Sequence, residues 1–252
     1  MTMPLIILPD WTIPSVIFYI IITMVIFSIT IADALKVSPL RYSKFRTREG
    51  VNSRIGMFLI YAIPLLVGYF FSSRYLGSAS LVQWLVFAAI ELHFAKRCLE
   101  VVFVHRYSGP IDLVTVYAIA TYYSFITGYA GYLHARTLPA PDSLLWLGAA
   151  LYLGGEALNF AHHRLLARLR KNTMQYRIPQ GGLFEYVACP HYLGEAIAWL
   201  GIALMSRHLF LYVVFLGTTA YLVERALRTQ AWYREKFRDY PRRRKAIIPF
   251  LL

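Results

Sequence analysis

The stretch YRIPQGGLFEYVACPHYLGEAIAWLG, residues 176–201, places ionisable side chains within a run that is long and apolar enough to cross a bilayer. Between Leu183 and Met205 lie two glutamates, one histidine and two tyrosines. A helix needs about 20 residues to span the hydrocarbon core. Ionisable residues inside such a helix are costly, and they usually face the bundle interior or a wet cavity. The stretch therefore predicts a membrane helix that contributes to a polar functional site.

The composition of the whole chain extends this prediction. Of 252 residues, 58% are hydrophobic and only 15% are charged, whereas soluble domains are about a quarter charged. The period-two alternation of barrel strands is absent, and lipid otherwise admits only helices. The first apolar stretch is too long for the core of a signal peptide, so we expect it to be a span. We predict an all-α integral membrane protein, a bundle of about seven transmembrane helices that forms a single membrane domain over residues 1–252.

Apolar runs locate the expected spans. They lie at residues 12–35, 55–72, 80–95, 112–133, 143–162, 184–205 and 208–224. The run CLEVVFVHRY, after the third span, is expected to extend that helix or to re-enter the membrane. The segment RLLARLRKNTMQYRIPQGG is a basic loop before the sixth span, and it ends in a Pro-Gln-Gly-Gly turn signal.

The distribution of basic residues predicts the orientation in the membrane. Of the 26 lysines and arginines, all but Arg74, Arg136 and Arg207 fall in the connectors of one side or in the tail. The positive-inside rule then places the C-terminus in the cytoplasm and the N-terminus outside or in a lumen. We expect the endoplasmic reticulum membrane in a eukaryote and the inner membrane in a bacterium.

Several function classes do not fit the sequence. The net charge is +13, but nucleic-acid binding needs a basic face on a soluble domain, and the chain offers none. Cys98 and Cys189 form no CxxC pair, so we expect no zinc site, no other metal and no disulfide framework. The absence of G-x-G-x-x-G and Walker motifs excludes Rossmann and P-loop nucleotide binding.

Polar residues of the expected spans gather on the basic side of the bundle. They are Asp33, Glu91, His93, Glu156, Asn159, His162, His163, the group from Glu185 to Glu195, Glu224 and Arg225. A polar pocket that opens to the cytoplasm explains this placement. Arginine forks match phosphate oxygens, so the nearby arginines favour a nucleotide cofactor; they are Arg170, Arg177, Arg225 and Arg228. The alternative is that these arginines only satisfy topology and lipid headgroups.

Three side chains of the sixth span are expected to converge. On a helix His191 and Glu195 share a face, and Tyr192 neighbours Glu195. A phenol in such a low-dielectric site can act as a proton donor. The alternative is a tyrosine anchored in the aromatic belt at the membrane interface.

Three blocks carry a resemblance to a known family. YRIPQGGLFEYVACPHYLGEAIAWLGIAL resembles the steroid 5-alpha-reductase family in its first half, while its CPHY is nearer the enoyl-CoA and polyprenol reductases. WYREKFRDYPRRRKAIIPFLL resembles the C-terminus shared by both branches of the family. ELHFAKRCLEVVFVHRYS is similar to the very-long-chain trans-2-enoyl-CoA reductases of the same family. A weaker block, SPLRYSKF, resembles the steroid branch.

The resemblance implies a seven-helix membrane oxidoreductase that moves hydride from NADPH to the beta carbon of a conjugated carbonyl lipid, with a proton going to the alpha carbon. It also implies that residues 143–252 bind the cofactor. The positions that match cofactor contacts of the family are Asn159, His163, Arg170, Tyr176, Arg177, His191, Glu195, Arg225 and Tyr233. Lys96 and Arg97 match a basic pair of the enoyl-CoA branch, and Tyr192 matches its candidate proton donor.

Some positions depart from the pattern of the family. His163 stands where the family usually has aspartate, and His191 stands where asparagine is more common. The second span, RIGMFLIYAIPLLVGYFF, lacks the glutamate that in the family polarises the substrate carbonyl or anchors a tyrosine. We expect Tyr61 to donate a hydrogen bond to the carbonyl oxygen, or Glu91 to substitute from the third span. Tyr61, Glu91 and Tyr192 are therefore the candidate catalytic residues.

Two other functions stay open at this point. CPHYLGE is similar to the His-Pro-x-Tyr-x-Gly-Glu stretch of isoprenylcysteine-type membrane methyltransferases, but its histidine follows the proline, and that class lacks YRIPQGG. The missing glutamate also fits an inactive membrane binding protein or a transporter, although no repeat of the transporter kind is present. The preferred substrate is a 4-ene-3-oxo steroid, with a trans-2-enoyl-CoA as the other candidate.

Overall fold

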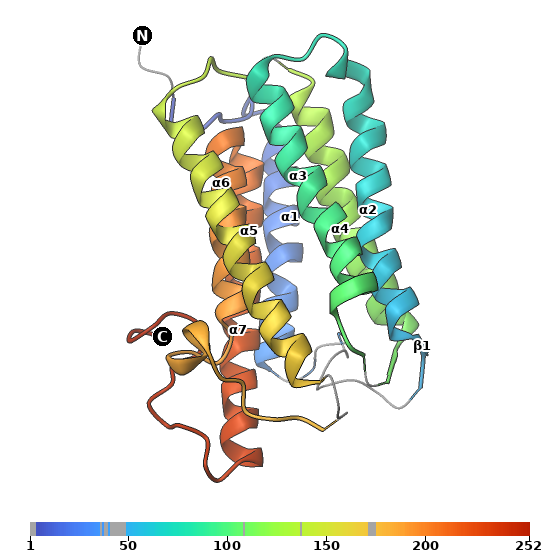
Figure 1. Cartoon of the computed structure of the whole chain (residues 1–252). Helices are drawn as coiled ribbons and strands as arrows, with labels where there is room; N and C mark the ends of the chain where they lie inside the picture. Colours follow the sequence, from blue (N-terminus) through green and yellow to red (C-terminus); the bar gives the residue numbers. More distant parts are fainter. Residues whose placement is uncertain are drawn as a thin grey trace.

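The computed structural model describes residues 4–35, 37, 40, 49–107, 109–136, 138–170 and 175–252. Within these residues the chain forms seven α-helices that lie side by side in one bundle (Figure 1). They are α1 (Ile13–Ala34), α2 (Ser53–Leu76), α3 (Leu81–Leu99), α4 (Leu113–His134), α5 (Ser143–Leu169), α6 (Pro190–Ser206) and α7 (Leu209–Lys236).

Four of these helices, α1, α2, α5 and α7, are long and apolar enough to cross a membrane. Large apolar side chains cover the outer surface of the bundle; on α2, for example, Leu66 is 68% exposed and Phe70 is 60% exposed. Soluble monomers rarely expose contiguous apolar surface on this scale, so the surface indicates contact with lipid. The predictions of a mainly helical fold and of an integral membrane protein are confirmed, with four helices identified as candidate spans.

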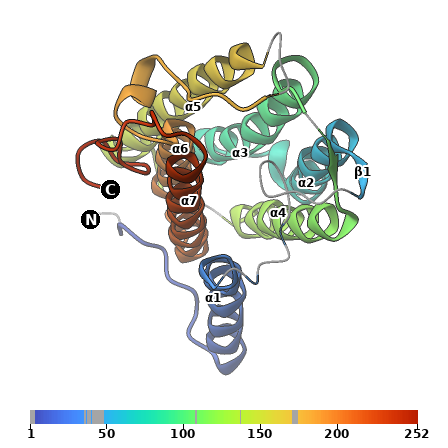
Figure 2. The ribbon, with the colours of Figure 1, turned by 90° about the horizontal axis from the view of Figure 1, so that it is seen from below.

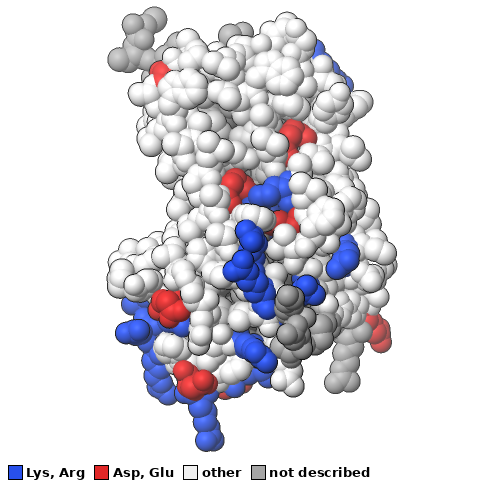
Figure 3. Space-filling view, in the orientation of Figure 1, with Lys and Arg blue, Asp and Glu red and all other residues white. Residues whose placement is uncertain are grey.

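The charged surface agrees with the segregation seen in the sequence. In Figure 3 most visible lysines and arginines lie in the half of the molecule where α7 ends, one blue group lies near the middle beside acidic residues, and one further blue patch lies at the opposite end. Part of the basic side lies outside the described residues. This applies to the SPLRYSKF block apart from Leu40, and to Lys36, Arg41, Lys44, Arg46, Arg48 and Lys171.

The sixth helix begins later than expected. The predicted span started at residue 184, whereas α6 begins at Pro190, after a 3-10 turn (η3) over Gly182–Glu185. Proline suits the first turn of a helix because its ring fixes φ and it has no N–H to leave unbonded, and it disfavours helix in the residue before it. Glu185 and Tyr186 therefore lie in the connector and not in the helix.

Three helices continue past their predicted ends at the basic side. α5 reaches Leu169 and α7 reaches Lys236, where residues 162 and 224 were expected. α3 passes into a π-helical turn (η2) over Glu100–Val104, so the CLEVVFVHRY run extends this helix. Arginine, glutamate and lysine end an apolar run, but they are good helix formers and do not end a helix.

Glycines bring α5 and α6 into close contact. A Cβ atom on Gly155 would lie 2.4 Å from the backbone nitrogen of Ala198, and one on Gly194 would lie 2.6 Å from that of Asn159. Small residues let membrane helices approach until their backbones touch. The contact places Asn159 of α5 beside the first turn of α6, within the polar stretch that marks the sequence.

The outermost helix is α1, which packs mainly on α7. Figure 2 shows α1 outside the ring that the other helices form. At the basic end, a two-stranded antiparallel sheet pairs β1 (Val51–Asn52) with β2 (Pro110–Ile111). This sheet ties the start of α2 to the connector that precedes α4.

The C-terminal segment is bonded to the connector that leads into α6. Val187 and Lys245 form a parallel bridge, and the backbone N–H of Ala188 donates to Lys245 O at 2.8 Å. Arg244 is 3% exposed, and its Nη1 donates to Pro179 O at 2.7 Å. These bonds hold the Pro-Gln-Gly-Gly turn in place next to the start of α6.

Candidate functional site

A cavity of about 300 Å³ lies among the helices and extends to the basic end of the bundle. All seven helices contribute to its walls. One part is apolar and includes Ile26, Met57 and Ile119. The other part carries the ionisable side chains of Arg97, His105, His163, Arg170, His191 and Glu195. A cavity with an apolar and a charged part suits ligands that combine both characters.

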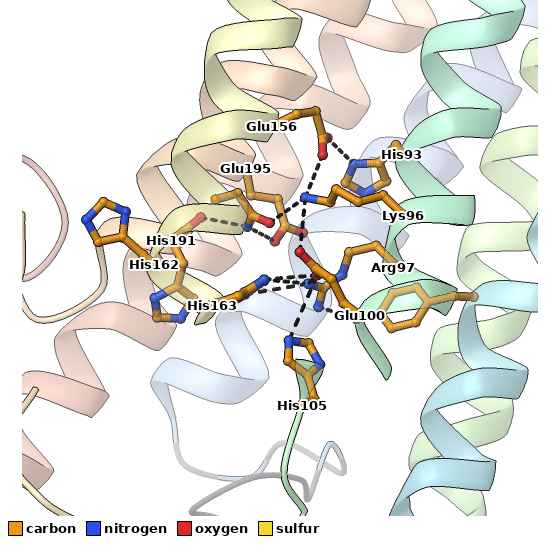
Figure 4. A network of polar contacts seen from close by, with 12 residues as sticks. His93, Lys96, Arg97, Glu100, His105, Glu156, His162, His163, His191 and Glu195 are labelled. Atoms are coloured by element: carbon orange, nitrogen blue, oxygen red, sulfur yellow. Dashed lines mark hydrogen bonds and ion pairs between the residues drawn. The ribbon is translucent and has the colours of Figure 1, made fainter. Parts of the chain in front are cut away.

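A network of ion pairs joins α3 to α5 next to this cavity (Figure 4). Lys96 Nζ lies 2.6 Å from Glu156 Oε2, and His93 Nδ1 lies 2.6 Å from Glu156 Oε1. Lys96 Nζ also donates to Asn159 Oδ1 at 2.7 Å. Buried charges are stable only when they are paired and hydrogen-bonded. Lys96 therefore serves the packing of the two helices, and its side chain does not line the cavity.

Asn159 connects this network to α6. It is 2% exposed, its Nδ2 donates to His191 O at 2.9 Å, and the same nitrogen lies 3.5 Å from Glu195 Oε2. The amide thus contacts Lys96 on one side and the first turn of α6 on the other. The structure brings together Asn159, His191 and Glu195, which the sequence places in three different turns of two helices.

Arg97 is the buried cation of the cavity wall. Its Nη1 donates to Glu100 Oε2 at 2.5 Å and lies 2.9 Å from His163 Nδ1, while its Nη2 donates to Tyr61 OH at 2.8 Å. Glu100 belongs to η2 and is 1% exposed. The guanidinium fork therefore holds a carboxylate on one nitrogen and a phenol on the other.

Glu100, His105 and His163 also offer ligand atoms that lie within 4.8 Å of one another. Carboxylate and imidazole groups at this spacing could hold a divalent cation. However, the Arg97 guanidinium already bonds Glu100 Oε2 and reaches His163 Nδ1. Because a positive charge occupies this place, we treat the three residues as part of the Arg97 network.

Arg170 and Tyr176 lie together at the basic end of the cavity. The Arg170 guanidinium carbon lies 4.6 Å from the centre of the Tyr176 ring, and its Nη1 donates to Arg106 O at 3.0 Å. The Tyr176 hydroxyl is buried without a hydrogen-bond partner among the described residues. Since an unsatisfied buried hydroxyl costs free energy, this group is a natural contact for a polar ligand.

Arg225 lies behind the cavity and not on its wall. It is 1% exposed, its Nη1 lies 3.6 Å from Asp33 Oδ1, and Arg228 Nη1 bonds the same oxygen of the fully buried Asp33. One carboxylate of α1 therefore holds two arginines of α7. Two further predicted residues also lie away from the cavity walls, because Tyr233 is buried in the packing of α7 and Arg177 is exposed.

Glu91 is not brought to the cavity. It packs against α2 at Gly68, where an added Cβ would lie 2.3 Å from Glu91 Oε1. Two residues of helix correspond to a turn of about 200°, so Glu91 and His93 face nearly opposite sides of α3. His93 faces the network and Glu91 faces away from it. The structure thus gives Glu91 no position from which to polarise a carbonyl bound in the cavity.

The two candidate tyrosines both line the cavity. Tyr61 of α2 is 7% exposed, and its ring stacks on Tyr123 at a centroid distance of 6.1 Å. Tyr192 lies in the first turn of α6, and its ring centre is 4.3 Å from that of His191. A phenol from α2 and a phenol from α6 therefore reach the same space.

The connector after η2 adds two uncharged groups to the basic end. Burial is the largest cause that lowers the pKa of His105 to about 2; the nearby His163 and the positive charge of Arg97 act in the same direction, and Glu100 opposes them. Burial also raises the pKa of Tyr107 above its ordinary value. His105 Nδ1 and Tyr107 OH lie 3.3 Å apart. Both side chains stay neutral near pH 7 and contribute hydrogen-bonding groups without charge.

Two residues that hold the site were missed by the sequence argument. Glu100 carries a local signal, because it follows Arg97 by three residues, a spacing at which helical side chains meet. Asp33 is predicted only as a polar residue at the end of a span. Its arginine partners are on the last helix, and Arg228 is 195 residues away in the chain. No local pattern reveals such a contact.

Comparison with known proteins places these residues in a wider context. The sequence model of the family described as 3-oxo-5-alpha-steroid 4-dehydrogenase matches residues 110–252. The chain is 34% identical over 203 residues to the very-long-chain enoyl-CoA reductase of Dictyostelium discoideum, which covers 76% of this chain and 68% of that protein. It is 36% identical over 178 residues to 3-oxo-5-alpha-steroid 4-dehydrogenase 1 of Bos taurus, which covers 67% of this chain and 68% of that protein. It is 40% identical over 133 residues to steroid 5-alpha-reductase DET2 of Gossypium hirsutum, which covers 48% of this chain and 52% of that protein.

Proposed function

This chain belongs to the 3-oxo-5-alpha-steroid 4-dehydrogenase family, and from that premise we propose that it uses NADPH to reduce the C=C bond of an α,β-unsaturated carbonyl lipid. The relatives described above are named as dehydrogenases or reductases of steroids and of enoyl-CoA. None of these three is named as a methyltransferase. The family assignment therefore favours the reductase function over methyl transfer.

The residues at the basic end of the cavity fit a phosphorylated dinucleotide. Arg170 supplies a guanidinium fork of the kind that matches phosphate oxygens, and the buried Tyr176 hydroxyl has room for a partner. We assign cofactor binding to the cavity-side residues, which are Asn159, His163, Arg170, Tyr176, His191 and Glu195. The proposal gives a smaller role in cofactor binding to three other residues, whose side chains lie away from the cavity walls. They are Arg177, Arg225 and Tyr233.

When bound, the cofactor supplies a hydride to the beta carbon of the substrate. Negative charge then develops on the carbonyl oxygen until the alpha carbon takes up a proton. In this proposal Tyr61 donates a hydrogen bond to the oxygen, and Tyr192 delivers the proton. The apolar part of the cavity holds the hydrocarbon body of the substrate and excludes water from the reacting atoms.

Between the two substrate classes, the site favours a compact enone such as a 4-ene-3-oxo steroid. Arg170 lies where we place the cofactor, and Lys96 is committed to Glu156 and Asn159. Few cations are therefore left on the cavity wall for the phosphates of coenzyme A. A trans-2-enoyl-CoA stays the second candidate because of the identity to an enoyl-CoA reductase.

We also infer that all seven helices cross the membrane, with the basic end in the cytoplasm. α3, α4 and α6 have 19, 22 and 17 residues, which is close to the length needed to cross the hydrocarbon core. α3 contains the charged residues Glu91, Lys96 and Arg97, α4 is rich in tyrosine and threonine, and α6 is the shortest of the seven helices. The basic end then gives the site access to cytoplasmic NADPH.

The observation that carries the proposal is the shared cavity onto which Tyr61, Tyr192, Arg170 and Tyr176 open. The test uses detergent-purified protein, with the melting temperature measured with NADPH or with S-adenosylmethionine. At a ligand concentration of 100 Kd, binding stabilises a protein by about 2.7 kcal/mol, so NADPH should raise the melting temperature clearly. A rise with S-adenosylmethionine alone would contradict the proposal.

The second part of this test measures NADPH oxidation with a 4-ene-3-oxo steroid and with a trans-2-enoyl-CoA. We expect turnover with the steroid and little with the enoyl-CoA. Turnover with the enoyl-CoA and little with the steroid would change the proposed substrate class but would still support reduction of a C=C bond. If NADPH binds and neither compound is reduced, the inactive binding protein becomes the better description.

A further inference from the structure

The guanidinium of Arg97 has a hydrogen-bond partner on each terminal nitrogen, and His163 Nδ1 also lies 2.9 Å from Nη1. Nη2 donates to Tyr61 OH at 2.8 Å, and Nη1 donates to Glu100 Oε2 at 2.5 Å. Tyr61 and Arg97 line the cavity, whereas Glu100 is 1% exposed and is not on the cavity wall. The carboxylate can therefore influence a bound ligand through its two partners on the cavity wall, Arg97 and His163.

The direction of the Arg97–Tyr61 hydrogen bond has a chemical consequence. A guanidinium has donors and no acceptor, so the phenol oxygen accepts in this bond. A phenol that accepts a hydrogen bond can also donate its own hydrogen to an acceptor. The bond also places a positive charge beside the phenol oxygen inside the bundle, where the low dielectric strengthens the interaction. Tyr61 is thereby made a stronger donor toward an oxygen that becomes negative.

Glu100 holds this cation in place. Its Oε2 also lies 3.0 Å from His163 Nδ1, and its Oε1 lies 3.5 Å from Lys96 Nζ. A buried arginine that loses its carboxylate is strongly destabilised and would turn toward other acceptors. The guanidinium carbon of Arg97 lies 4.8 Å from the centre of the Tyr61 ring, so such a turn would move the phenol as well.

We propose that Tyr61, Arg97 and Glu100 act as one unit: Tyr61 donates a hydrogen bond to the carbonyl oxygen of the substrate, Arg97 stabilises the negative charge that develops there, and Glu100 positions Arg97. The inference rests on the proposed function, because it assigns the groups that stabilise the oxyanion of that reaction. Tyr61 is not consumed in the cycle. The oxygen gains charge when hydride adds to the beta carbon and loses it when the alpha carbon is protonated.

A double-mutant cycle on turnover tests this unit. Removing one preorganised donor to an oxyanion typically costs ~10²–10³ in rate, and we expect Tyr61→Phe to lower kcat by this factor. Glu100→Gln should lower kcat by about tenfold or more. Because Glu100 also bonds His163, kcat is measured at saturating NADPH and the Kd for NADPH is determined separately. Together the two changes should cost no more than about threefold beyond Tyr61→Phe alone, since coupled residues are not additive. A purely structural Glu100 would instead give multiplicative losses.

Arg97→Lys is the second variant and covers the case in which Glu100→Gln does not fold. Lysine keeps the charge but has no fork that can bond the phenol and the carboxylate together. We expect the same non-additive result with Tyr61→Phe. Glu235→Gln is the matched control, because Glu235 is exposed at the end of α7, and it should keep wild-type turnover.

A binding measurement separates failure of this inference from failure of the proposed function. A saturated 3-oxo steroid, which cannot be reduced at a C=C bond, is titrated into wild type, Tyr61→Phe and Glu100→Gln with melting temperature as the readout. If the steroid raises the melting temperature of both variants less than that of wild type, the result supports joint action of Tyr61, Arg97 and Glu100, even if wild type turns over no substrate. Equal stabilisation of all three proteins, or multiplicative losses in the cycle, would overturn it.

Discussion

Asn159 Nδ2 donates to the backbone carbonyl of His191 at 2.9 Å, and this amide joins the α3–α5 ion pairs to the first turn of α6. The bond requires the two helices to touch. They do so because Gly194 has no side chain, and a Cβ there would lie 2.6 Å from the backbone nitrogen of Asn159. The geometry of the cavity wall at the start of α6 thus depends on the absence of a side chain at Gly194.

Gly194→Ala should therefore separate α5 from α6 and break the Asn159–His191 bond. Overpacking of this kind costs about 1–3 kcal/mol, so we expect a lower melting temperature together with weaker NADPH binding. The control is Gly154→Ala on the same helix pair, because a Cβ at Gly154 meets nothing within 4 Å. If both variants behave alike, the close contact does not organise the site.

Tyr176→Phe removes a buried hydroxyl that has no partner among the described residues. Without ligand the variant should be as stable as wild type or slightly more stable, because an unsatisfied group is lost. NADPH affinity should fall by about tenfold, the equivalent of one good hydrogen bond. Calorimetric titration with NADPH checks this, with Tyr69→Phe on the exposed side of α2 as control. An unchanged NADPH affinity would remove Tyr176 from the cofactor site.

Asp33→Asn removes the carboxylate that pairs with Arg225 and Arg228. Breaking a buried ion pair by removing one partner typically costs about 3–5 kcal/mol, so unfolding in denaturant should occur much earlier. Asp10→Asn, at an exposed position outside the helices, should leave stability unchanged. A variant Asp33→Asn with wild-type stability would mean that the arginines find other partners at no cost.

His208, just before α7, predicts a pH dependence of stability. Burial lowers the pKa of His208 from 6.5 to about 4, with a smaller contribution from Arg136. Below pH 6.5 the unfolded chain therefore binds a proton at His208 that the folded chain does not bind. The contribution of His208 to the free energy of unfolding is fully present above pH 6.5 and is lost as the pH decreases. The loss should be about 2 kcal/mol at pH 5.

The measurement is the melting temperature between pH 5 and pH 8, for wild type and for His208→Gln. Other groups that face His208 are His134, whose ring centre lies 5.5 Å away, and Arg136. The variant should show a shallower decline toward low pH. An identical decline in both proteins would show that His208 is not the titrating group.

Most of the architecture could be predicted from sequence because apolar run length and charge segregation are direct consequences of the lipid environment. The helix ends could not. Pro190 delays α6, and charged helix formers prolong α7 to Lys236. An apolar run ends where the chain leaves the hydrocarbon layer of the membrane, whereas a helix ends where its backbone hydrogen bonds end.

The site was predictable where residues are close in the chain or belong to a recognised motif. Asn159, His191 and Glu195, which the resemblance names as cofactor contacts, lie next to one another in the structure. Glu100 could have been found from its position three residues after Arg97, a spacing at which helical side chains meet. The contact of Glu91 with Gly68 of α2, in contrast, has no signal in the local sequence. Contacts between the first and last helices, such as that of Asp33, leave no trace in local spacing.

The central claim is that this cavity joins NADPH to an unsaturated carbonyl lipid and reduces its C=C bond. The most direct measurement supplies NADPH carrying deuterium at the transferable position, together with a 4-ene-3-oxo steroid, and analyses the product by mass spectrometry. The account predicts one deuterium on the beta carbon of a saturated product, and a large loss of that product in Tyr61→Phe. A product without deuterium, or no NADPH-dependent product from either the steroid or a trans-2-enoyl-CoA, would contradict it.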